Sequence, residues 1–232
     1  MQIIEEKKIT LGFSSAEDGD LSFYLMPDDQ ISQVWKNIPQ IKSLSLKEPA
    51  FVQQVHRDEI LNLQTAGSFL RGTADAVYTR LLDQPVGVFS ADCLPLIIFS
   101  EKACAAVHAG WRGTLLDIAG KTVMKFVANG CPADSLKAFI GPCIGQCCLE
   151  MGEEVFEEFQ AYDQSYSDFF QKREKWHLNL RELNRYQLER AGVMPEKILV
   201  DSACTFCLEK EFFSFRRQKR RNGSMFSFVV RR

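Results

Sequence analysis

Short apolar runs recur along the middle of the chain and predict buried β-strands. They are rich in Val, Ile, Leu and Phe and are bounded by polar or turn-forming residues, as strands covered on both faces are. The runs lie at residues 86–89, 94–99, 103–107, 138–140 and 198–200. We therefore expect at least one sheet with both faces buried.

Helical spacing of apolar residues alternates with these runs. Apolar positions three and four residues apart predict helices over 114–128, 153–159 and 180–191, each followed by glycine, proline or polar residues. Strands mixed with helices in this way predict an α+β fold. Because the sequence contains no repeat and no linker-like segment, we expect a single domain over 1–232.

The C-terminal third carries two more β-like patterns. Alternation through Trp176 and His177 predicts a strand, and because its surroundings are charged we do not expect His177 to be a metal ligand. The runs 212–215 and 225–230 flank an Asn-Gly pair and predict a hairpin with a tight turn.

Composition and charge favour a small-molecule partner. The 232 residues are 46% hydrophobic and 25% charged, which is ordinary for a globular domain with one core. Lys and Arg number 28 and Asp and Glu number 30, so the formal net charge is −2. No overall field attracts a nucleic acid or an anionic membrane, and we expect neither as a partner.

The N-terminal segment, the longest apolar run and the cysteines lead us to expect a cytoplasmic protein. The N-terminal MQIIEEKKITLGF has charges where a secretory signal needs an apolar stretch, and the run 85–99 is too short to cross a membrane and is interrupted by Asp92. In a reducing compartment the eight cysteines are expected as free thiols or metal ligands, since a chain of this length does not need disulfides.

His56, Cys93 and His108 each stand at the end of an apolar run, where rigid strands deliver side chains to a site. Two imidazoles and a thiolate form a soft set of three ligands that suits zinc with a fourth position open for water or substrate. No compact motif such as CxxC joins them. On spacing alone, hydrogen-bonded core histidines and a small buried thiol are the more frequent arrangement.

The residues around this trio add an anion site and a candidate proton carrier. Gly110 and Gly113 bracket a turn into a helix near Thr114, where backbone N–H groups favour an anion and Arg112 supplies a planar cation. A metal and an anion would then share one cleft, although a plain tight turn with a surface arginine is the alternative. Asp92 is the candidate proton carrier, or else a strand-end carboxylate bonded to backbone N–H groups.

Five further cysteines fall into two groups: Cys143, Cys147 and Cys148, and then Cys204 and Cys207. Four thiolates would close a structural zinc site, but the irregular first spacing favours buried thiols beside a substrate pocket, with Cys143 as a substrate contact. A thioredoxin-like role for CTFC lacks a clear βαβ context.

A basic run contains Arg216, Arg217, Lys219, Arg220 and Arg221. One interpretation of this run is a patch that binds nucleic acid. We instead expect Arg216 and Arg217 to flank the pocket and bind substrate, and the other three to form a solvated hairpin tip.

Seven segments together resemble the YfiH family, also called laccase-domain proteins or multicopper polyphenol oxidases. They are QQVH, TADAVYTR, VGVFSADCLPLIIF, AAVHAGWRG, IGPCIGQCCLEMGEEV, LRELNRYQLERAGV and SACTFCLEKEFFSFRR. The likeness covers most of the chain. It departs at the N-terminus, where LGFSSAEDG replaces a glycine-rich segment of the family.

The resemblance implies an α/β/β/α layered fold with zinc bound by His56, Cys93 and His108. It also implies phosphorolysis of adenosine, inosine, guanosine and methylthioadenosine, together with adenosine deamination. Purine nucleosides and phosphate would then be the partners, and the oligomeric state stays open.

Three alternatives remain. A copper-dependent phenol oxidase would use copper at the same site, but a four-copper set held by histidine pairs needs more than the three histidines of this chain. A hydrolase would use Cys93 as nucleophile and His108 as base. A non-catalytic, metal-dependent interaction protein would bind zinc without turnover.

Overall fold

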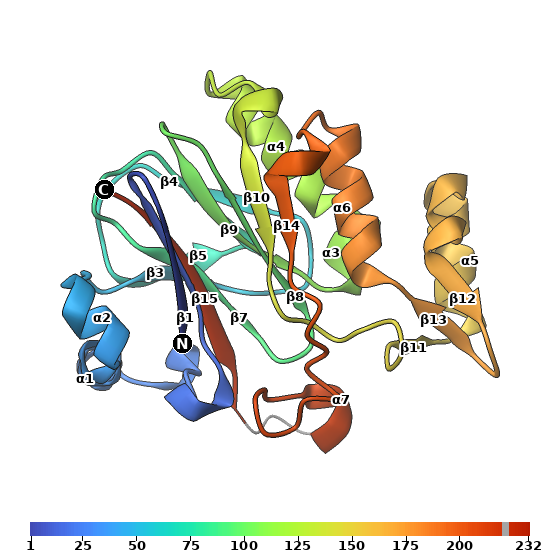
Figure 1. Ribbon diagram of the computed structural model, residues 1–232, viewed down its shortest axis with the longest axis horizontal. Helices are drawn as coiled ribbons and strands as arrows, with labels where there is room; N and C mark the ends of the chain where they lie inside the picture. Colours follow the sequence, from blue (N-terminus) through green and yellow to red (C-terminus); the bar gives the residue numbers. More distant parts are fainter. Residues whose placement is uncertain (220–222) are drawn as a thin grey trace.

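Two six-stranded sheets stack face to face in the computed structural model, which describes residues 1–219 and 223–232 (Figure 1). The first sheet has the order β1 (Gln2–Glu6), β2 (Ile9–Phe13), β15 (Met225–Arg231), β7 (Val86–Ser90), β3 (Ala50–Gln53) and β5 (Phe69–Thr73). The second has the order β14 (Ile198–Val200), β10 (Lys137–Ile140), β8 (Leu94–Phe99), β9 (Cys104–Ala109), β6 (Ala76–Thr79) and β4 (Ile60–Leu63).

Helices cover the outer face of each sheet (Figure 1). The first sheet carries α1 (Asp28–Asn37) and α2 (Pro39–Leu44), and the second carries α3 (Trp111–Leu115), α4 (Ile118–Ala128) and α6 (Leu180–Arg190). The order of layers is therefore α/β/β/α, which confirms the predicted α+β fold and its layered type.

Strand β8 shows why the central runs read as continuously apolar. Its residues alternate in direction: Leu96 and Ile98 pack toward the helices of the second sheet, whereas Ile97 and Phe99 pack between the two sheets. Every residue of β8 is buried. A strand covered on both faces has no position where a polar side chain reaches water.

A small three-stranded sheet projects beside α6 and completes the fold (Figure 1). It contains β11 (Glu150–Met151), β13 (Trp176–Leu178) and β12 (Phe170–Lys172), and α5 (Glu153–Tyr162) packs on it. The rings of Phe156 and Trp176 stack with centroids 3.8 Å apart. The predicted strand at Trp176 is confirmed. Short 3-10 helices lie at Ala16–Asp18, Phe23–Leu25, Ala133–Ser135, Gln164–Phe169 and Pro195–Lys197.

The helix predicted over 114–128 is two helices. The helix is interrupted between α3 and α4. There Asp117 adopts a left-handed conformation with φ 60°, and its carboxylate accepts a hydrogen bond from the N–H of Gly120. An aspartate that caps a new helix start interrupts a pattern that is otherwise continuous in apolar spacing. The predicted helices at 153–159 and 180–191 are confirmed, with α5 extending to Tyr162.

The predicted C-terminal hairpin is wrong. Residues 212–215 form no strand, and Phe215–Gln218 is instead a short helix, α7, capped by Ser214. Strand β15 pairs with β2 and β7, so its partners come from the start and middle of the chain. Asn222 of the predicted turn lies outside the described residues, as do Arg220 and Arg221.

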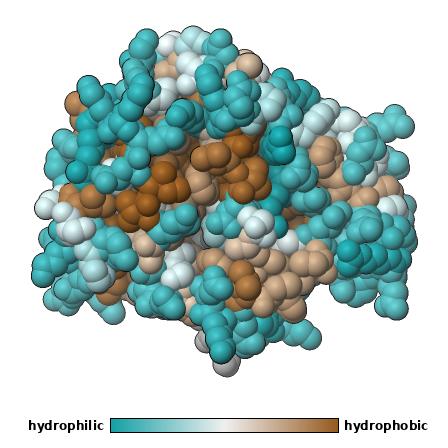
Figure 2. All heavy atoms as spheres, in the orientation of Figure 1, coloured by the Kyte–Doolittle hydropathy of each residue, from teal (hydrophilic) through white to brown (hydrophobic). Residues whose placement is uncertain are grey.

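Polar residues cover most of the face seen in Figure 2, and hydrophobic residues gather across its middle. Among the described residues, no helix is long and apolar enough to cross a membrane.

Candidate active site

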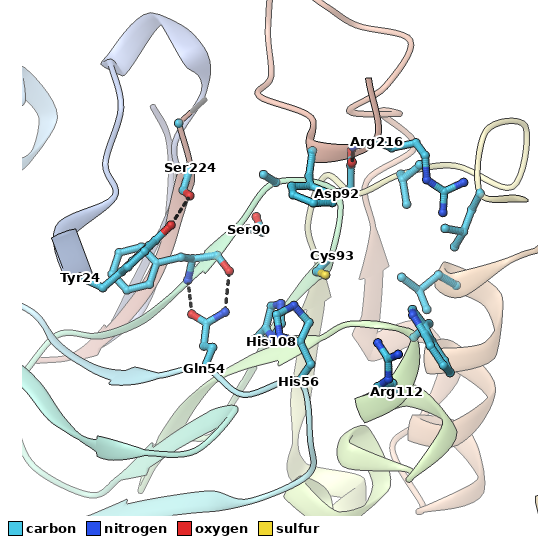
Figure 3. Close-up of a pocket in the computed structure, with 18 of the residues that line it drawn as sticks. Tyr24, Gln54, His56, Ser90, Asp92, Cys93, His108, Arg112, Arg216 and Ser224 are labelled. Carbon is cyan, nitrogen blue, oxygen red and sulfur yellow. Dashed lines mark hydrogen bonds between the residues drawn. The ribbon is translucent and has the colours of Figure 1, made fainter. Parts of the chain in front are cut away.

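His56, Cys93 and His108 converge from three separate elements. His56 lies in the loop after β3, Cys93 in the turn between β7 and β8, and His108 on β9. One ligand atom from each lies within 4.8 Å of the others, and their side chains meet at the centre of Figure 3. The structure therefore brings the predicted trio together. His108 is buried, Cys93 is half-buried and His56 is exposed, so the group opens to one side.

Asp75 holds the two histidines in place, and sequence reasoning missed it. Its fully buried carboxylate lies 2.8 Å from Nδ1 of His108 and accepts hydrogen bonds from the backbone N–H groups of Val55, His56 and Arg57 at 2.8–3.1 Å. This arrangement leaves Nε2 of His108 as the ligand atom, in the pattern of a carboxylate that orients a metal-bound histidine. It also stabilises the left-handed backbone of His56, whose φ is 60°.

The charges within this group favour a thiolate. Burial opposes ionisation of Cys93, but the charge and hydrogen bonding of His108 and a hydrogen bond from His56 lower its pKa to about 6. For His108, burial lowers the pKa, but Cys93 and Asp75 together raise it to about 9. Burial also works against the charge of Asp75, yet His108 and the backbone N–H of Arg57 bring its pKa below the ordinary value. The thiolate is the form of cysteine that binds metals.

Two glycines of the HAGWRG segment are required by close packing. A Cβ atom on Gly110 would lie 3.2 Å from Sγ of Cys93 and 3.4 Å from His56. A Cβ atom on Gly113 would lie 2.8 Å from the backbone oxygen of Arg57. The helix predicted to begin near Thr114 begins at Trp111, immediately after Gly110.

A pocket of about 520 Å³ adjoins the trio, within the usual size range of small-molecule sites. Figure 3 shows Arg112 and Arg216 on one side of the three ligands and Tyr24, Gln54 and Ser224 on the other. The guanidinium of Arg112 stacks 4.0 Å from the ring centroid of Trp111. The remaining residues that line the pocket are Val52, Gln53, Phe89, Ser90, Ala91, Asp92, Ile144, Leu149, Leu180, Phe215 and Gly223.

Asp92 borders this pocket, but its carboxylate is already engaged. It accepts hydrogen bonds from the hydroxyl of Thr205 at 2.7 Å, the hydroxyl of Ser214 at 3.0 Å and the backbone N–H of Arg216 at 2.7 Å. Asp92 therefore fastens the turn that carries Cys93 to the segment that carries Arg216.

The structure does not bring Arg217 or Cys143 to the pocket. The guanidinium of Arg217 donates to the carbonyl oxygens of Thr205, Phe206 and Phe212 at 2.7–2.9 Å, which makes it a brace for its own loop. Cys143 is fully buried beside Cys204 and is absent from the pocket lining. Of the four predicted substrate contacts, Arg112 and Arg216 line the pocket.

The donor set suits one metal ion, not a copper cluster. His177, the third histidine of the chain, lies on β13 with Nδ1 2.8 Å from the carbonyl oxygen of Gln146. In the described part of the chain it belongs to neither group of residues that could hold a metal. Because histidine pairs are the ligands of multicopper centres, these residues do not fit several copper ions.

The fold and the site together define a layered α/β/β/α protein with a candidate metal site beside a small-molecule pocket. The family model described as multi-copper polyphenol oxidoreductase laccase matches residues 8–232. The chain belongs to this family, and the predicted resemblance is confirmed.

Individual relatives agree with this assignment. A Clostridium acetobutylicum protein named purine nucleoside phosphorylase is 34% identical over 98% of this chain and 94% of its own length. A protein named adenosine deaminase, from an unknown prokaryotic organism, is 35% identical over 76% of this chain and 69% of its own. The crystal structure of the Bacillus licheniformis hypothetical protein YfiH aligns with a TM-score of 0.88 and 27% identity, covering 99% of this chain and 96% of that one.

Proposed function

We propose that this chain is a zinc-dependent purine nucleoside enzyme. It would cleave adenosine, inosine, guanosine and methylthioadenosine by phosphorolysis and would deaminate adenosine. The observation that carries the proposal is the convergence of His56, Cys93 and His108 on a pocket that also presents Arg112 and Arg216. The names of the two relatives, one a phosphorylase and one a deaminase, support both reactions.

The ligand set implies what the metal supplies. Zinc held by two imidazoles and a thiolate keeps an open position and acts as a Lewis acid on the group bound there. His108 would bind through Nε2, because Asp75 occupies Nδ1. The lowered pKa of Cys93 supplies the thiolate ligand near neutral pH.

The arginines account for the use of phosphate. In phosphorolysis an oxygen of the hydrogen phosphate dianion forms a bond to C1′ of the ribose while the bond from C1′ to the purine nitrogen breaks. The purine takes up the proton that the phosphate gives up. Arg112 and Arg216 would hold the phosphate dianion on one side of the metal ligands, since one guanidinium group can donate two parallel hydrogen bonds to phosphate oxygens. Tyr24, on the opposite wall, offers a ring against which a purine can stack. Asp92 would position Cys93 and Arg216 instead of carrying a proton.

A turnover assay tests this proposal. Zinc-loaded protein should release hypoxanthine from inosine only when phosphate is present, and should convert adenosine to inosine without phosphate. Cys93→Ser should abolish both reactions, whereas Cys131→Ser, which changes a buried thiol outside the pocket, should retain them. Inosine left intact by the zinc-loaded protein, with and without phosphate, would show that the proposal is wrong.

Copper-dependent phenol oxidation is the second candidate, because two histidines and one cysteine are also the equatorial ligands of a blue-copper centre. The described pocket lining includes no methionine for the axial position. An intense blue absorption band on copper loading, together with oxygen consumption in the presence of a phenol, would favour this activity over nucleoside cleavage.

A further inference from the structure

A second set of thiols gathers outside the pocket. Cys147 and Cys148 belong to the segment after β10, and Cys204 and Cys207 to the segment after β14. One sulfur atom from each of the four residues lies within 4.8 Å of the others, and all four thiols are free. None of them lines the pocket that holds Arg112.

Four of the six distances between these sulfur atoms lie close to the edge length of a tetrahedron around one ion. Sγ of Cys147 lies 3.8 Å from those of Cys204 and Cys207 and 3.5 Å from that of Cys148, and Cys148 and Cys207 are 3.4 Å apart. Zinc–sulfur bonds of about 2.3 Å in tetrahedral geometry place sulfur atoms about 3.8 Å apart. Cys147 has three sulfur neighbours, so the four thiols form one group.

The backbone around Gly145 allows the two segments that carry the four cysteines to lie close together. The N–H of Gly145 donates to Sγ of Cys204 at 3.1 Å, as backbone groups around metal thiolates do. A Cβ atom on Gly145 would lie 3.1 Å from the sulfur of Cys147 and 3.3 Å from that of Cys204, so glycine leaves the room that the sulfurs need. Cys143 and Cys204 form a parallel bridge, and the guanidinium of Arg181 donates to the carbonyl oxygens of Cys143 and Ala203.

We propose that Cys147, Cys148, Cys204 and Cys207 bind one zinc ion through four thiolates, in a closed structural site separate from the His56–Cys93–His108 site. Binding exchanges the thiol protons for the metal ion and releases them to solvent. Four thiolates leave no open position, so this ion performs no chemistry. It fastens the segment that carries Ile144 and Leu149 to the segment that carries Thr205, and thereby fixes one wall of the pocket.

Metal counting tests this proposal without reference to activity. Full-length protein purified without added metal or chelator should contain two zinc ions per chain. X-ray absorption at the zinc edge should then report about two and a half sulfur ligands per zinc, the mean of a one-sulfur and a four-sulfur site. One zinc per chain with a single sulfur ligand overturns the proposal, whether thiol titration finds the four thiols free or oxidised to disulfides.

Variants assign each ion to its site. Cys148→Ser/Cys207→Ser should hold one zinc with mainly nitrogen ligands, whereas His56→Ala/Cys93→Ser should hold one zinc with four sulfur ligands. Cys104→Ser/Cys131→Ser, a matched double change of two buried thiols outside both groups, should keep two. If the first variant does not fold, the metal count and sulfur number of the unmodified protein still decide the question. Two zinc ions retained by a folded Cys148→Ser/Cys207→Ser protein would also overturn the proposal.

Discussion

One carboxylate oxygen of Asp75 lies 2.8 Å from Nδ1 of His108, and both side chains are buried. The same oxygen accepts the backbone N–H of His56 at 2.9 Å. A single acid therefore orients one candidate ligand through its ring and the other through its backbone. Loss of the Asp75 carboxylate should therefore weaken metal binding more than loss of an ordinary buried hydrogen bond would, because both ligands depend on it.

Asp75→Asn should weaken zinc binding at the His56–Cys93–His108 site about 10- to 100-fold, the usual effect of removing a carboxylate that supports a ligating histidine. The amide keeps the size of the side chain but loses the charge and one acceptor. Competition against a chromophoric chelator measures the change. Asp168→Asn, an exposed acid far along the chain, is the control and should leave the affinity unchanged. Unchanged zinc affinity in Asp75→Asn would show that the contact is structural only.

The alkylation of Cys93 should report both its pKa and its ligation. Since the pKa is lowered to about 6, the metal-free protein should react with iodoacetamide at a rate that rises through pH 6 and levels off above it, where the thiolate predominates. Zinc should suppress this reaction because the sulfur is then a ligand. Mass spectrometry of the modified peptide separates Cys93 from the other thiols. Equal reactivity with and without zinc would favour the Cys93–His108 hydrolase over a metal site.

The central strands and the trio were predictable because their signals are local. Strands β8 and β9 read as unbroken apolar runs since both of their faces are covered. Cys93 and His108 were recognised because each stands at the end of such a run. The break at Asp117 was not predictable from apolar spacing, because a left-handed capping residue leaves the spacing intact.

Asp75 and α7 depended on contacts between distant segments. Asp75 reaches His108 because Ala76 pairs with Val107 in the β6–β9 ladder, a relationship that spacing along the chain does not reveal. An acid inside the apolar TADAVYT run was the available signal, since a buried carboxylate requires partners. The hairpin prediction failed because β15 pairs with β2, which comes from the other end of the chain.

Gly110→Ala should disturb the candidate metal site while leaving the fold intact. The added methyl would lie 3.2 Å from the sulfur of Cys93, so the ligands must shift by a few tenths of an ångström. Gly110 has φ −68°, which alanine adopts without strain, and the effect should therefore appear in zinc affinity more than in the melting temperature. Gly67→Ala is the matched control, since the three atoms nearest to its added methyl belong to the flexible end of Arg71. Wild-type zinc affinity in Gly110→Ala would indicate that the ligands do not close around a metal here.

Arg216 and Arg217 are adjacent, yet we expect alanine at Arg216 to impair phosphate binding and alanine at Arg217 to lower stability. Arg216 lines the pocket, so Arg216→Ala should raise the KM for phosphate at least tenfold with little change in melting temperature. Arg217 donates to three carbonyl oxygens of its own loop, so Arg217→Ala should destabilise the protein by about 1–3 kcal/mol by leaving those groups without their donor. Thermal unfolding and phosphate titration of both variants separate the two roles. An Arg216→Ala protein with an unchanged KM for phosphate would remove Arg216 from the substrate contacts, and the phosphate would then depend on Arg112 alone.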